Sequence, residues 1–442
     1  MSQYQIIGGN PLKGEVSIRG AKNASFKQII ASMLTKDTVH LTNVPSISDV
    51  HLTQSIAQSL GSQIKQVGLH GLEITTKKIT SSIVPSGTGE KSRSSFMFAP
   101  PLLLRTGKAV VPTPGGDKLG ARPLDRLFDC YKSMGIDVDV TNSSIAFKTS
   151  GIKATHYIFP QPSHTVTEVV IMTASLAKGD TVIENSAREP EIDDLIDMLN
   201  SMGAKIQRDP KNLSTIYITG VSSLHQTEHQ IIADRNESVT FACATLATKG
   251  SINILRVDPK IINTFLDTIT AMGAEVVRGR DEVTISWVGP LKACDIETSP
   301  EPGFMTDWQA LFSLVLTQAV GSSSVIERVF PSRFQHIATL NQMGAKTKFF
   351  NPTPEDPAKY YHFNLDTDKP EYFHGVKIYG PTKLKPINLT VSDLRAGATA
   401  TLAALTAVGK STIQGVEFIE RGYENLADRL RSLGAQITYI KT

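Results

Sequence analysis

A short phrase recurs six times along the 442-residue chain and limits what the chain can fold into. Its copies are "SLGSQI", "SMGIDV", "SMGAKI", "AMGAEV", "QMGAKT" and "SLGAQI", with glycines at 61, 135, 203, 273, 344 and 434. The separations between these glycines are 74, 68, 70, 71 and 90 residues. Because each phrase ends a helical pattern and opens a strand, its glycine is expected to cap a helix in the left-handed conformation. Solenoid repeats are usually shorter, roughly 20 to 50 residues, so two domains of three units are favoured over a solenoid binding scaffold.

A second helical segment precedes each phrase and is apolar nearly all round. These segments are "AKNASFKQIIASML", "SRSSFMFAPPLLL", "TVTEVVIMTASLAKG", "NESVTFACATLATKG", "TDWQALFSLVLTQAVG" and "LRAGATATLAALTAVGK". A helix without a polar face is expected to be buried. Strand-like pieces such as "TVIENSA", "SINILRV" and "STIQGVE" complete the unit. The sequence therefore predicts an α/β fold of two similar domains, each built from three units of mixed strands and two helices.

The domain boundary is expected after the third unit, near Gln230. The predicted first domain is 22–230 and carries a glycine-rich loop at 112–126. The predicted second domain is 1–21 plus 231–442, because the strands "YQIIGG" and "GEVSIRG" are expected to pair with it. A site in the cleft between the domains is the expectation, since ligand pockets often lie at domain interfaces.

Composition excludes several classes of protein. The chain is 40% hydrophobic and 20% charged, as in ordinary globular proteins, and its net charge of +3 argues against a broad nucleic-acid surface. Cys130, Cys243 and Cys294 lie far apart, which predicts a reducing compartment and no zinc cluster. No signal pattern opens the chain and no apolar run approaches the roughly 20 residues of a membrane span, so a cytoplasmic protein without metal or redox cofactor is expected. His225 and His229 are interpreted as surface residues.

Charged or polar residues gather where the buried helices begin. They are Lys22, Asn23, Arg93, Glu168, Glu237, Asp307 and Arg395. For any one of them a solvated helix end is the simpler interpretation, and Asp307 could be a plain N-cap. Equivalent positions in repeated units could instead converge on one cleft, where the cations would bind an anion and Asp307 would act as a general base.

The stretch "VPTPGGDKLGARPLDR" places three glycines around Asp117 and then adds Arg122 and Arg126. Glycines let a backbone approach a ligand closely, and arginines bind phosphate or carboxylate in a planar fork. An acid is unexpected in such an anion-binding loop, so Asp117 needs a role of its own.

The ordered motifs resemble those of the enolpyruvyl transferases over essentially the whole chain. The matching pieces are "GAKNA", "PGGDKLGARPLD", "ENSAREPEI", "ADRNES", "PGFMTDWQ", "VFPSRF", "SDLRAGA" and "ERGYENLADRLRSLGA". "AREPEI", "SDLRA" and "RGYENL" are more similar to the branch that acts on a UDP-sugar than to the branch that acts on shikimate 3-phosphate. The resemblance implies two inside-out α/β barrels of three units each.

The resemblance also implies a reaction and its residues. Phosphoenolpyruvate would be joined to the 3-hydroxyl of UDP-N-acetylglucosamine with release of phosphate, a step of peptidoglycan precursor synthesis. Catalytic residues would be Asp117 as proton donor, Asp307 as acceptor of the hydroxyl proton, and Lys22. Lys22 and Arg122 would hold the phosphate, and Arg395 and Arg421 the carboxylate. The residues implied to contact the UDP-sugar are Asn23, Arg93, Arg122, Pro123, Leu124, Asp125, Arg126, Asp307 and Val329.

The chain departs from the family pattern at several positions. Asp117 stands where the family usually has cysteine, and we hypothesise that closure of the loop desolvates Asp117 and raises its pKa enough for it to donate a proton. The carboxylate is also a poorer nucleophile than a thiolate, which predicts resistance to fosfomycin. "SHTVT" (163–167), Leu127, Pro331, Ser332 and Asn236 are further departures.

These departures keep two alternatives open. The residues implied to bind phosphoenolpyruvate are retained, while the loops implied to contact the nucleotide are altered. The acceptor could therefore be a nucleoside monophosphate or shikimate 3-phosphate. An inactive paralogue that binds a nucleotide-sugar is the second alternative, and retention of Lys22, Asp307, Arg395 and Arg421 argues against it. The sequence leaves the oligomeric state open.

Overall fold

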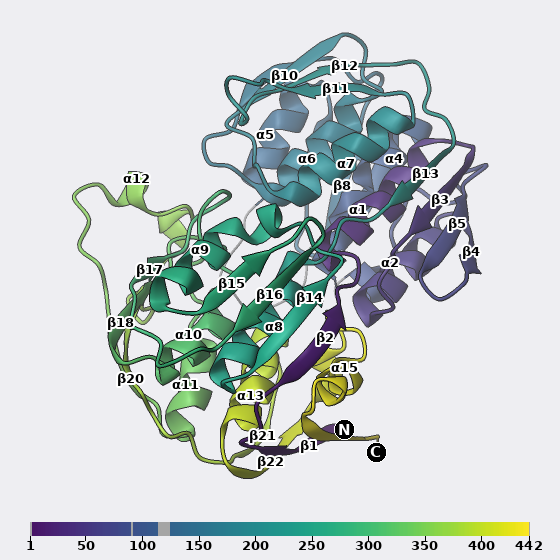
Figure 1. Ribbon diagram of the computed structural model, residues 1–442. Helices are drawn as coiled ribbons and strands as arrows, with labels where there is room; N and C mark the ends of the chain where they lie inside the picture. The colour runs from purple at the N-terminus through teal and green to yellow at the C-terminus, as the bar shows by residue number, and fades with distance from the viewer. Residues whose placement is uncertain (1, 90–91, 114–123, 442) are drawn as a thin grey trace. The chain divides into compact units, whose positions relative to one another are not determined.

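The computed structural model describes the chain except for residues 1, 90–91, 114–123 and 442 and the side chains at 88, 89 and 93. The described residues form two compact units, each with its own hydrophobic core (Figure 1). The N-terminal unit consists of the described residues within Gly20–Gly116 and Pro123–Ile232. The C-terminal unit consists of those within Met1–Arg19 and Ala233–Thr442. Asp117, Arg122 and Pro123 lie outside the described residues.

Three sheets build the described part of the N-terminal unit. The first has the order β13 (Thr227–Gln230), β3 (Thr38–Thr42), β5 (Gly71–Thr75), β4 (Gln63–Val67). The second has the order β6 (Lys108–Pro112), β8 (Ser144–Lys148), β7 (Asp137–Val140). The third has the order β11 (Lys205–Arg208), β12 (Ile216–Thr219), β10 (Asp180–Glu184), β9 (His156–Ile158). Burial alternates along strands such as β10 and β12, so each of these strands presents one side to the core.

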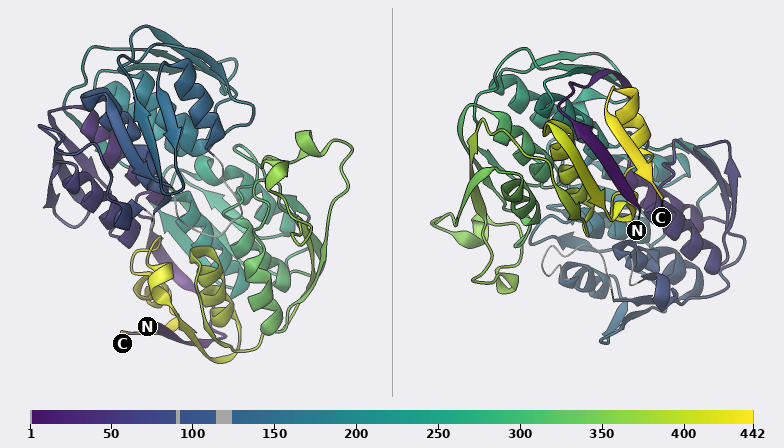
Figure 2. Two further views of the ribbon diagram at one scale, coloured as in Figure 1. Left: turned by 180° about the vertical axis from the view of Figure 1, so that it is seen from behind. Right: turned by 90° about the horizontal axis from the view of Figure 1, so that it is seen from below.

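Three sheets likewise build the described part of the C-terminal unit. The first has the order β21 (Asn388–Thr390), β22 (Gly409–Gln414), β1 (Gln3–Gly8), β23 (Gln436–Ile440). The second has the order β15 (Glu275–Arg278), β16 (Glu282–Ser286), β14 (Ser251–Leu255), β2 (Lys13–Ser17). The third has the order β17 (Ile296–Glu297), β18 (Gly321–Ile326), β20 (Gly375–Gly380), β19 (Lys346–Phe350). The right-hand view of Figure 2 shows purple β1 between β22 and β23, with which it pairs antiparallel. β2 pairs parallel with β14. The predicted pairing of the first two strands with the second half of the chain is therefore confirmed.

The helices divide into central and outer ones, as the sequence predicts. The central helices, buried along most of their length, are α1 (Lys22–Ala31), η2 (Arg93–Phe98) with α4 (Ala99–Thr106), α6 (His164–Ala174), α8 (Arg235–Ala247), α10 (Gln309–Gln318) and α13 (Leu394–Thr406). The outer helices, which bury one face, are α2 (Ser48–Ser59), α5 (Asp125–Ser133), α7 (Pro190–Ser201), α9 (Asn263–Met272), α11 (Gln335–Gln342) and α15 (Leu426–Ser432). Short segments are η1 (Ser32–Leu34), α3 (Ser86–Gly89), η3 (Pro259–Ile262), α12 (Pro357–Tyr360), η4 (Leu365–Thr367) and α14 (Val416–Ile419).

Small residues and threonines let the central helices pack without a polar face. Every residue of α8 is buried, and its Thr240 and Thr245 hydroxyls donate to the carbonyls of Asn236 and Phe241 at 2.7 and 2.8 Å. These bonds satisfy buried hydroxyls inside their own helix. A Cβ at Gly397 of α13 would lie only 2.9 Å from Ile419, so glycine permits the close approach there.

Each repeated phrase caps an outer helix and leads into a strand. All six glycines have positive φ, between 75° and 114°. Gly203 N donates to Asn200 O at 2.9 Å and Ala204 N donates to Leu199 O at 2.9 Å, and the other five phrases repeat this pair of bonds. The second bond spans a full turn and satisfies a carbonyl at the helix end, as in a Schellman motif. The predicted left-handed caps are confirmed.

The long separation between the last two phrase glycines has a local cause. The hairpin between β19 and β20 is connected by residues 351–374, which carry α12 and η4. Figure 1 shows this light-green segment standing out from the sheet of β18 and β20.

The phrase glycines make a testable prediction about stability. Gly273 has φ +102°, and a Cβ there would meet no atom within 4 Å, so strain in the backbone is the expected cost of a side chain. We expect Gly273→Ala to lower the free energy of unfolding by about 1–2 kcal/mol, as measured by urea denaturation. Gly289→Ala is the matched control, because it has equal space and lacks the positive φ. Equal losses of unfolding free energy in the two variants would contradict the role of Gly273 as a left-handed helix cap.

Candidate active site

Asp307 lies in a turn before α10, and its carboxylate joins two arginines from distant parts of the C-terminal unit. Oδ1 accepts from Arg333 at 2.9 Å and from Arg395 Nε at 3.1 Å. Burial alone would raise the pKa of Asp307, but Arg333 and Arg395 hold it well below its usual range. The N-cap of α10 is Trp308 and has no side-chain cap bond, so the N-cap interpretation of Asp307 is wrong.

Arg395 stands in the first turn of α13, behind the N-cap Asp393, whose carboxylate accepts from Ala396 N at 2.7 Å. Its guanidinium also donates to the Tyr423 hydroxyl at 2.8 Å. Thr240 of α8 lies 2.8 Å from the same hydroxyl. Burial would lower the pKa of Arg395, but Tyr423 and Asp307 raise it above its usual value. The central helices α8 and α13 are therefore linked through one buried tyrosine.

Arg421 lies half-buried in the turn between α14 and α15. A Cβ on the next residue, Gly422, would lie 2.8 Å from Leu394 at the start of α13. Glycine therefore lets this turn pack against the beginning of the helix that carries Arg395. Two of the arginines expected to bind one carboxylate are thus held in the same region of the C-terminal unit.

A buried carboxylate shapes the segment 327–334, which contains Val329. Glu327 accepts from Val329 N at 2.8 Å, from Phe330 N at 3.0 Å and from the Thr306 hydroxyl at 2.7 Å. Burial raises its pKa, although Arg333 opposes the shift. Arg333 bonds both Thr306 and Asp307, and its carbonyl accepts from Gln309. Sequence reasoning missed Arg333, although its place in "VFPSRF" was a signal that could have identified it.

In the N-terminal unit, Lys22 is the first residue of α1, with its Nζ 2.7 Å from Asp49 Oδ2. The N-cap of α1, Ala21, provides no side-chain acceptor for the first-turn amides. Asn23 follows at a half-buried position. A cation and a helix N-terminus therefore coincide, a combination that favours a bound anion.

A buried cluster links α1 to α6. Lys27 Nζ lies 3.0 Å from Glu168 Oε2, and His164 Nε2 lies 3.2 Å from Glu168 Oε1. Glu168 has no exposed surface. Burial would lower the pKa of His164, but Glu168 outweighs it and the pKa is raised. Glu168 is thus a partner of internal cations, and the "SHTVT" segment is fixed against the helix of Lys22.

The remaining predicted residues of this unit lie near α5. Leu124 is its buried N-cap residue, Asp125 is exposed in the first turn, and Arg126 donates to Pro162 O at 3.2 Å. Burial lowers the pKa of Arg126, opposed by Tyr157 and Asp125. Arg126 therefore lies beside the segment that leads into α6. Arg93 begins η2, and its side chain lies outside the described residues.

Glu237 and His229 both have internal partners. Glu237 in α8 is bound by Arg429 and by Arg19 N at 3.0 Å, so it belongs to an internal ion pair. His229 was expected at the surface, but its Nε2 lies 2.9 Å from Asp194 and its side chain is only 13% exposed. The surface assignment of His229 is wrong because β13 turns this side chain toward α7, while His225 is exposed.

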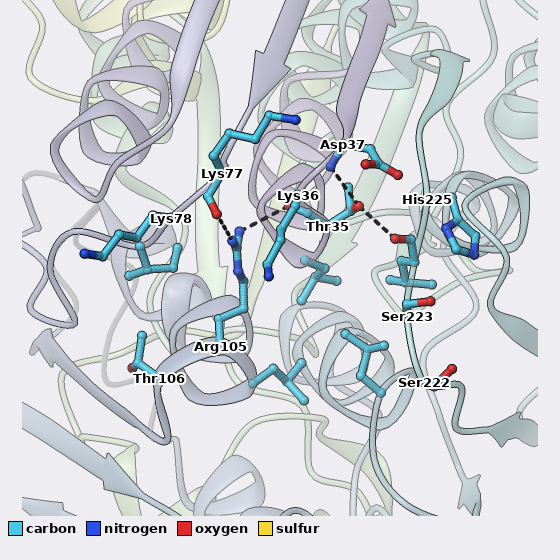
Figure 3. A pocket seen from close by; sticks show the side chains of 15 residues that line it. Thr35, Lys36, Asp37, Lys77, Lys78, Arg105, Thr106, Ser222, Ser223 and His225 are labelled. Atoms are coloured by element: carbon cyan, nitrogen blue, oxygen red, sulfur yellow. Dashed lines mark hydrogen bonds between the residues drawn. The ribbon is translucent and has the colours of Figure 1, made fainter.

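A cavity of about 740 Å³ lies in the N-terminal unit, with Lys36, Lys77, Lys78 and Arg105 in its lining (Figure 3). Arg105 donates to the carbonyls of Met33, Thr35, Thr76 and Lys77 at 2.7–3.1 Å. The three lysines are exposed. Arg105 therefore links these chain segments through hydrogen bonds, and no described residue predicted to bind substrate lines this cavity.

None of the described helices combines the length and the apolar character that crossing a membrane requires.

Comparisons with known proteins agree with this architecture. Residues 6–430 match the family model of EPSP synthase (3-phosphoshikimate 1-carboxyvinyltransferase). Proteins of Dichelobacter nodosus and Idiomarina loihiensis, both named UDP-N-acetylglucosamine 1-carboxyvinyltransferase, are 35% and 36% identical and match over 100% and 99% of both chains. The enolpyruvyl transferase NikO from Streptomyces tendae superposes with a TM-score of 0.85 at 22% identity, covering 100% of this chain and 99% of its own. EPSP synthase from Acinetobacter baumannii gives 0.72 at 18% identity over the whole of both chains. The predicted fold class is confirmed.

The raised pKa of His164 makes stability depend on pH. Protonated His164 is stabilised in the folded protein, so its contribution is present below pH 6.5, the ordinary value, and is lost as pH rises through the raised folded pKa. We expect His164→Gln to lower the free energy of unfolding more at about pH 5.5 than at about pH 8.5 in urea titrations. In a Glu168→Gln background this difference should vanish. An equal loss of unfolding free energy at both pH values would show that the His164–Glu168 pair does not cause the pH dependence of stability.

Proposed function

The chain belongs to the EPSP synthase family of enolpyruvyl transferases, and from this premise we propose that it transfers the enolpyruvyl group of phosphoenolpyruvate to the 3-hydroxyl of UDP-N-acetylglucosamine and releases phosphate. One observation carries the proposal: Asp307 is held between Arg333 and Arg395 in a chain that matches carboxyvinyltransferases from end to end. The reaction would supply peptidoglycan precursor synthesis, and with it cell-wall biogenesis and cell division. Both substrates are water-soluble metabolites, as expected of a cytoplasmic enzyme.

The reaction divides into addition and elimination. A proton is added to the methylene carbon of phosphoenolpyruvate while the sugar hydroxyl oxygen bonds to carbon 2 and gives up its own proton. The resulting tetrahedral intermediate loses a proton from its methyl group and breaks its bond to phosphate, which restores the double bond. One acid, one base and an anion clamp are sufficient for these steps.

We assign Asp307 as the base that receives the hydroxyl proton. Its two arginine contacts keep it ionised at neutral pH, as a base must be, but also make it a weak one. If Arg395 turns to the carboxylate of phosphoenolpyruvate, Asp307 loses one of these cations and its pKa rises. Substrate binding would therefore increase the basicity of Asp307 when it is needed.

We assign the anion clamp to four cations. Lys22 and Arg122 would bind the phosphate, and Arg395 and Arg421 the carboxylate. Lys22 at the start of α1 supports the first assignment, because its charge adds to that of the helix N-terminus. Asn23, Arg93, Leu124, Asp125, Arg126 and the backbone at Val329 are proposed to contact the nucleotide-sugar, with Arg122 and Pro123 from outside the described residues.

Asp117 is proposed to donate the proton. A free aspartate has a pKa near 3.9 and is almost fully ionised at neutral pH. Desolvation beside bound phosphate would raise the pKa of Asp117 and make donation possible. This assignment rests on the position of Asp117 in "PGGDKLGARPLD", which lies outside the described residues.

The acceptor is tested by phosphate release with phosphoenolpyruvate and each of three acceptors. We expect turnover with UDP-N-acetylglucosamine and none with UMP or shikimate 3-phosphate, because the retained motifs belong to the UDP-sugar branch. Turnover with either of the others would reassign the acceptor. Binding of the UDP-sugar without turnover would favour an inactive paralogue.

Asp307→Asn tests the base. We expect kcat to fall about 10²- to 10⁴-fold, the usual range for general acid–base catalysis, while circular dichroism and the melting transition show a folded protein. Asp281→Asn is the control, since Asp281 is 76% exposed in the same unit, and it should leave kcat unchanged. Full turnover of Asp307→Asn would exclude the role of base.

Asp117 is tested through its nucleophilicity as well as its acidity. We expect the unchanged protein to resist fosfomycin, because a carboxylate opens the epoxide poorly, and Asp117→Asn to lose turnover. Asp117→Cys should become inactivated over time, with the adduct located on the new cysteine by mass spectrometry. An adduct on Asp117 itself, or full activity of Asp117→Asn, would contradict the assignment.

A further inference from the structure

The loop of residues 351–374, here called the long loop, is a departure from the repeat. The corresponding hairpins of four other units use residues 68–70, 141–143, 209–215 and 279–281, and in the last unit β23 pairs with β1 instead. Loops of such length in compact domains are usually functional or disordered. This loop is folded, because its own side chains build a small core.

That core is aromatic. The rings of Tyr361, Phe363 and His374 are buried, with centroids 4.9–5.2 Å apart. His374 N donates to Asn351 Oδ1 at 2.8 Å, and His374 Nε2 lies 3.0 Å from Asp368 Oδ2. The beginning and the end of the long loop are thus tied together through one histidine.

The long loop holds Arg328 and its neighbour Glu327. His362 N donates to Arg328 O at 2.7 Å, and Arg328 Nε donates to Tyr360 O at 2.9 Å. The Arg328 guanidinium lies 4.2 Å from the centre of the Tyr360 ring and bonds Glu297 at 2.9 Å. Glu327 N donates to His374 O at 2.8 Å. Two consecutive residues at the start of segment 327–334 are therefore bound by the loop, and Arg328 is bound as well by Glu297 and Thr298, whose hydroxyl accepts from Arg328 N at 2.9 Å.

The same segment reaches the candidate base at its other end. Glu327 bonds the amides of Val329 and Phe330, and Arg333 bonds Asp307. Val329 directly follows Arg328, and three residues lie between Val329 and Arg333. A displacement of Arg328 therefore affects the Val329 backbone directly and Asp307 only through Arg333.

We propose that the long loop is an acceptor-positioning element, and that Arg328 is the positioning residue through which it acts. By holding Arg328, the loop sets the position of the Val329 backbone and thereby the affinity for the nucleotide-sugar. The inference rests on the proposed function, which places Val329 against that substrate. Arg328 acts through its neighbours and takes no part in the bond-making steps.

Arg328→Gln tests the inference through steady-state kinetics. The substitution removes the cation above Tyr360, the bond to its carbonyl and the bond to Glu297. A hydrogen bond made by a charged group inside a protein is worth about tenfold or more in an equilibrium constant, which sets the scale of the expected effect. We expect KM for UDP-N-acetylglucosamine to rise about tenfold while KM for phosphoenolpyruvate stays within about twofold. Arg280→Gln is the matched control, since Arg280 is 97% exposed in the same unit.

Hydrogen exchange provides a readout that does not require activity. In Arg328→Gln the amides of Val329 and Phe330 should exchange faster than in the unchanged protein, because Arg328, which directly precedes Val329, no longer bonds Tyr360 O and Glu297. Unchanged exchange there, or equal increases in both KM values, would overturn the inference and leave the long loop a structural support. If the unchanged protein turns over no acceptor, the proposed function fails, and the exchange measurement still decides whether the loop positions this segment.

Discussion

The ion pairs of Asp307 organise the part of the C-terminal unit on which the proposed chemistry depends. They join the turn before α10, the segment 327–334 and the start of α13, and Tyr423 extends the connection to α8. Because these side chains are partly buried, the Coulomb interaction between their charges is stronger than it would be in water. The contacts that stabilise this arrangement also make Asp307 a weak base, so the proposed reaction requires Arg395 to exchange one carboxylate for another.

Charges near the starts of the central helices differ in burial and in the role that we propose for them. Glu168 and Glu237 are buried within ion pairs, where removal of one partner would leave an uncompensated charge at a cost of about 3–5 kcal/mol. Lys22 and Arg395 keep part of their surface exposed at equivalent helix starts. The partners of each charge therefore differ between units: two carboxylates are buried against cations, while Lys22 and Arg395 keep the exposed surface that the proposed anion clamp requires.

The repeat also explains where the chain can vary. Caps and central helices are under packing constraints in every unit, as the close approach at Gly397 and the satisfied threonines of α8 illustrate. Hairpin connections lie outside these constraints, and loops tolerate insertion at little entropic cost. The long loop uses this freedom to build a second small core against the segment that carries Val329.

The sequence by itself determined the repeat, the six left-handed caps, the buried helices and the family, while the expected pairing of the first two strands with the second half of the chain needed the tertiary structure. These follow from periodicity, glycine at fixed offsets and ordered motifs, all of which are local. Tertiary structure decided the partners: Arg333 beside Asp307, Lys27 beside Glu168, Tyr423 between two helices, and His229 turned inward to Asp194. Side chains separated by tens of residues meet only after packing, so no spacing in the sequence encodes their distance or their pKa.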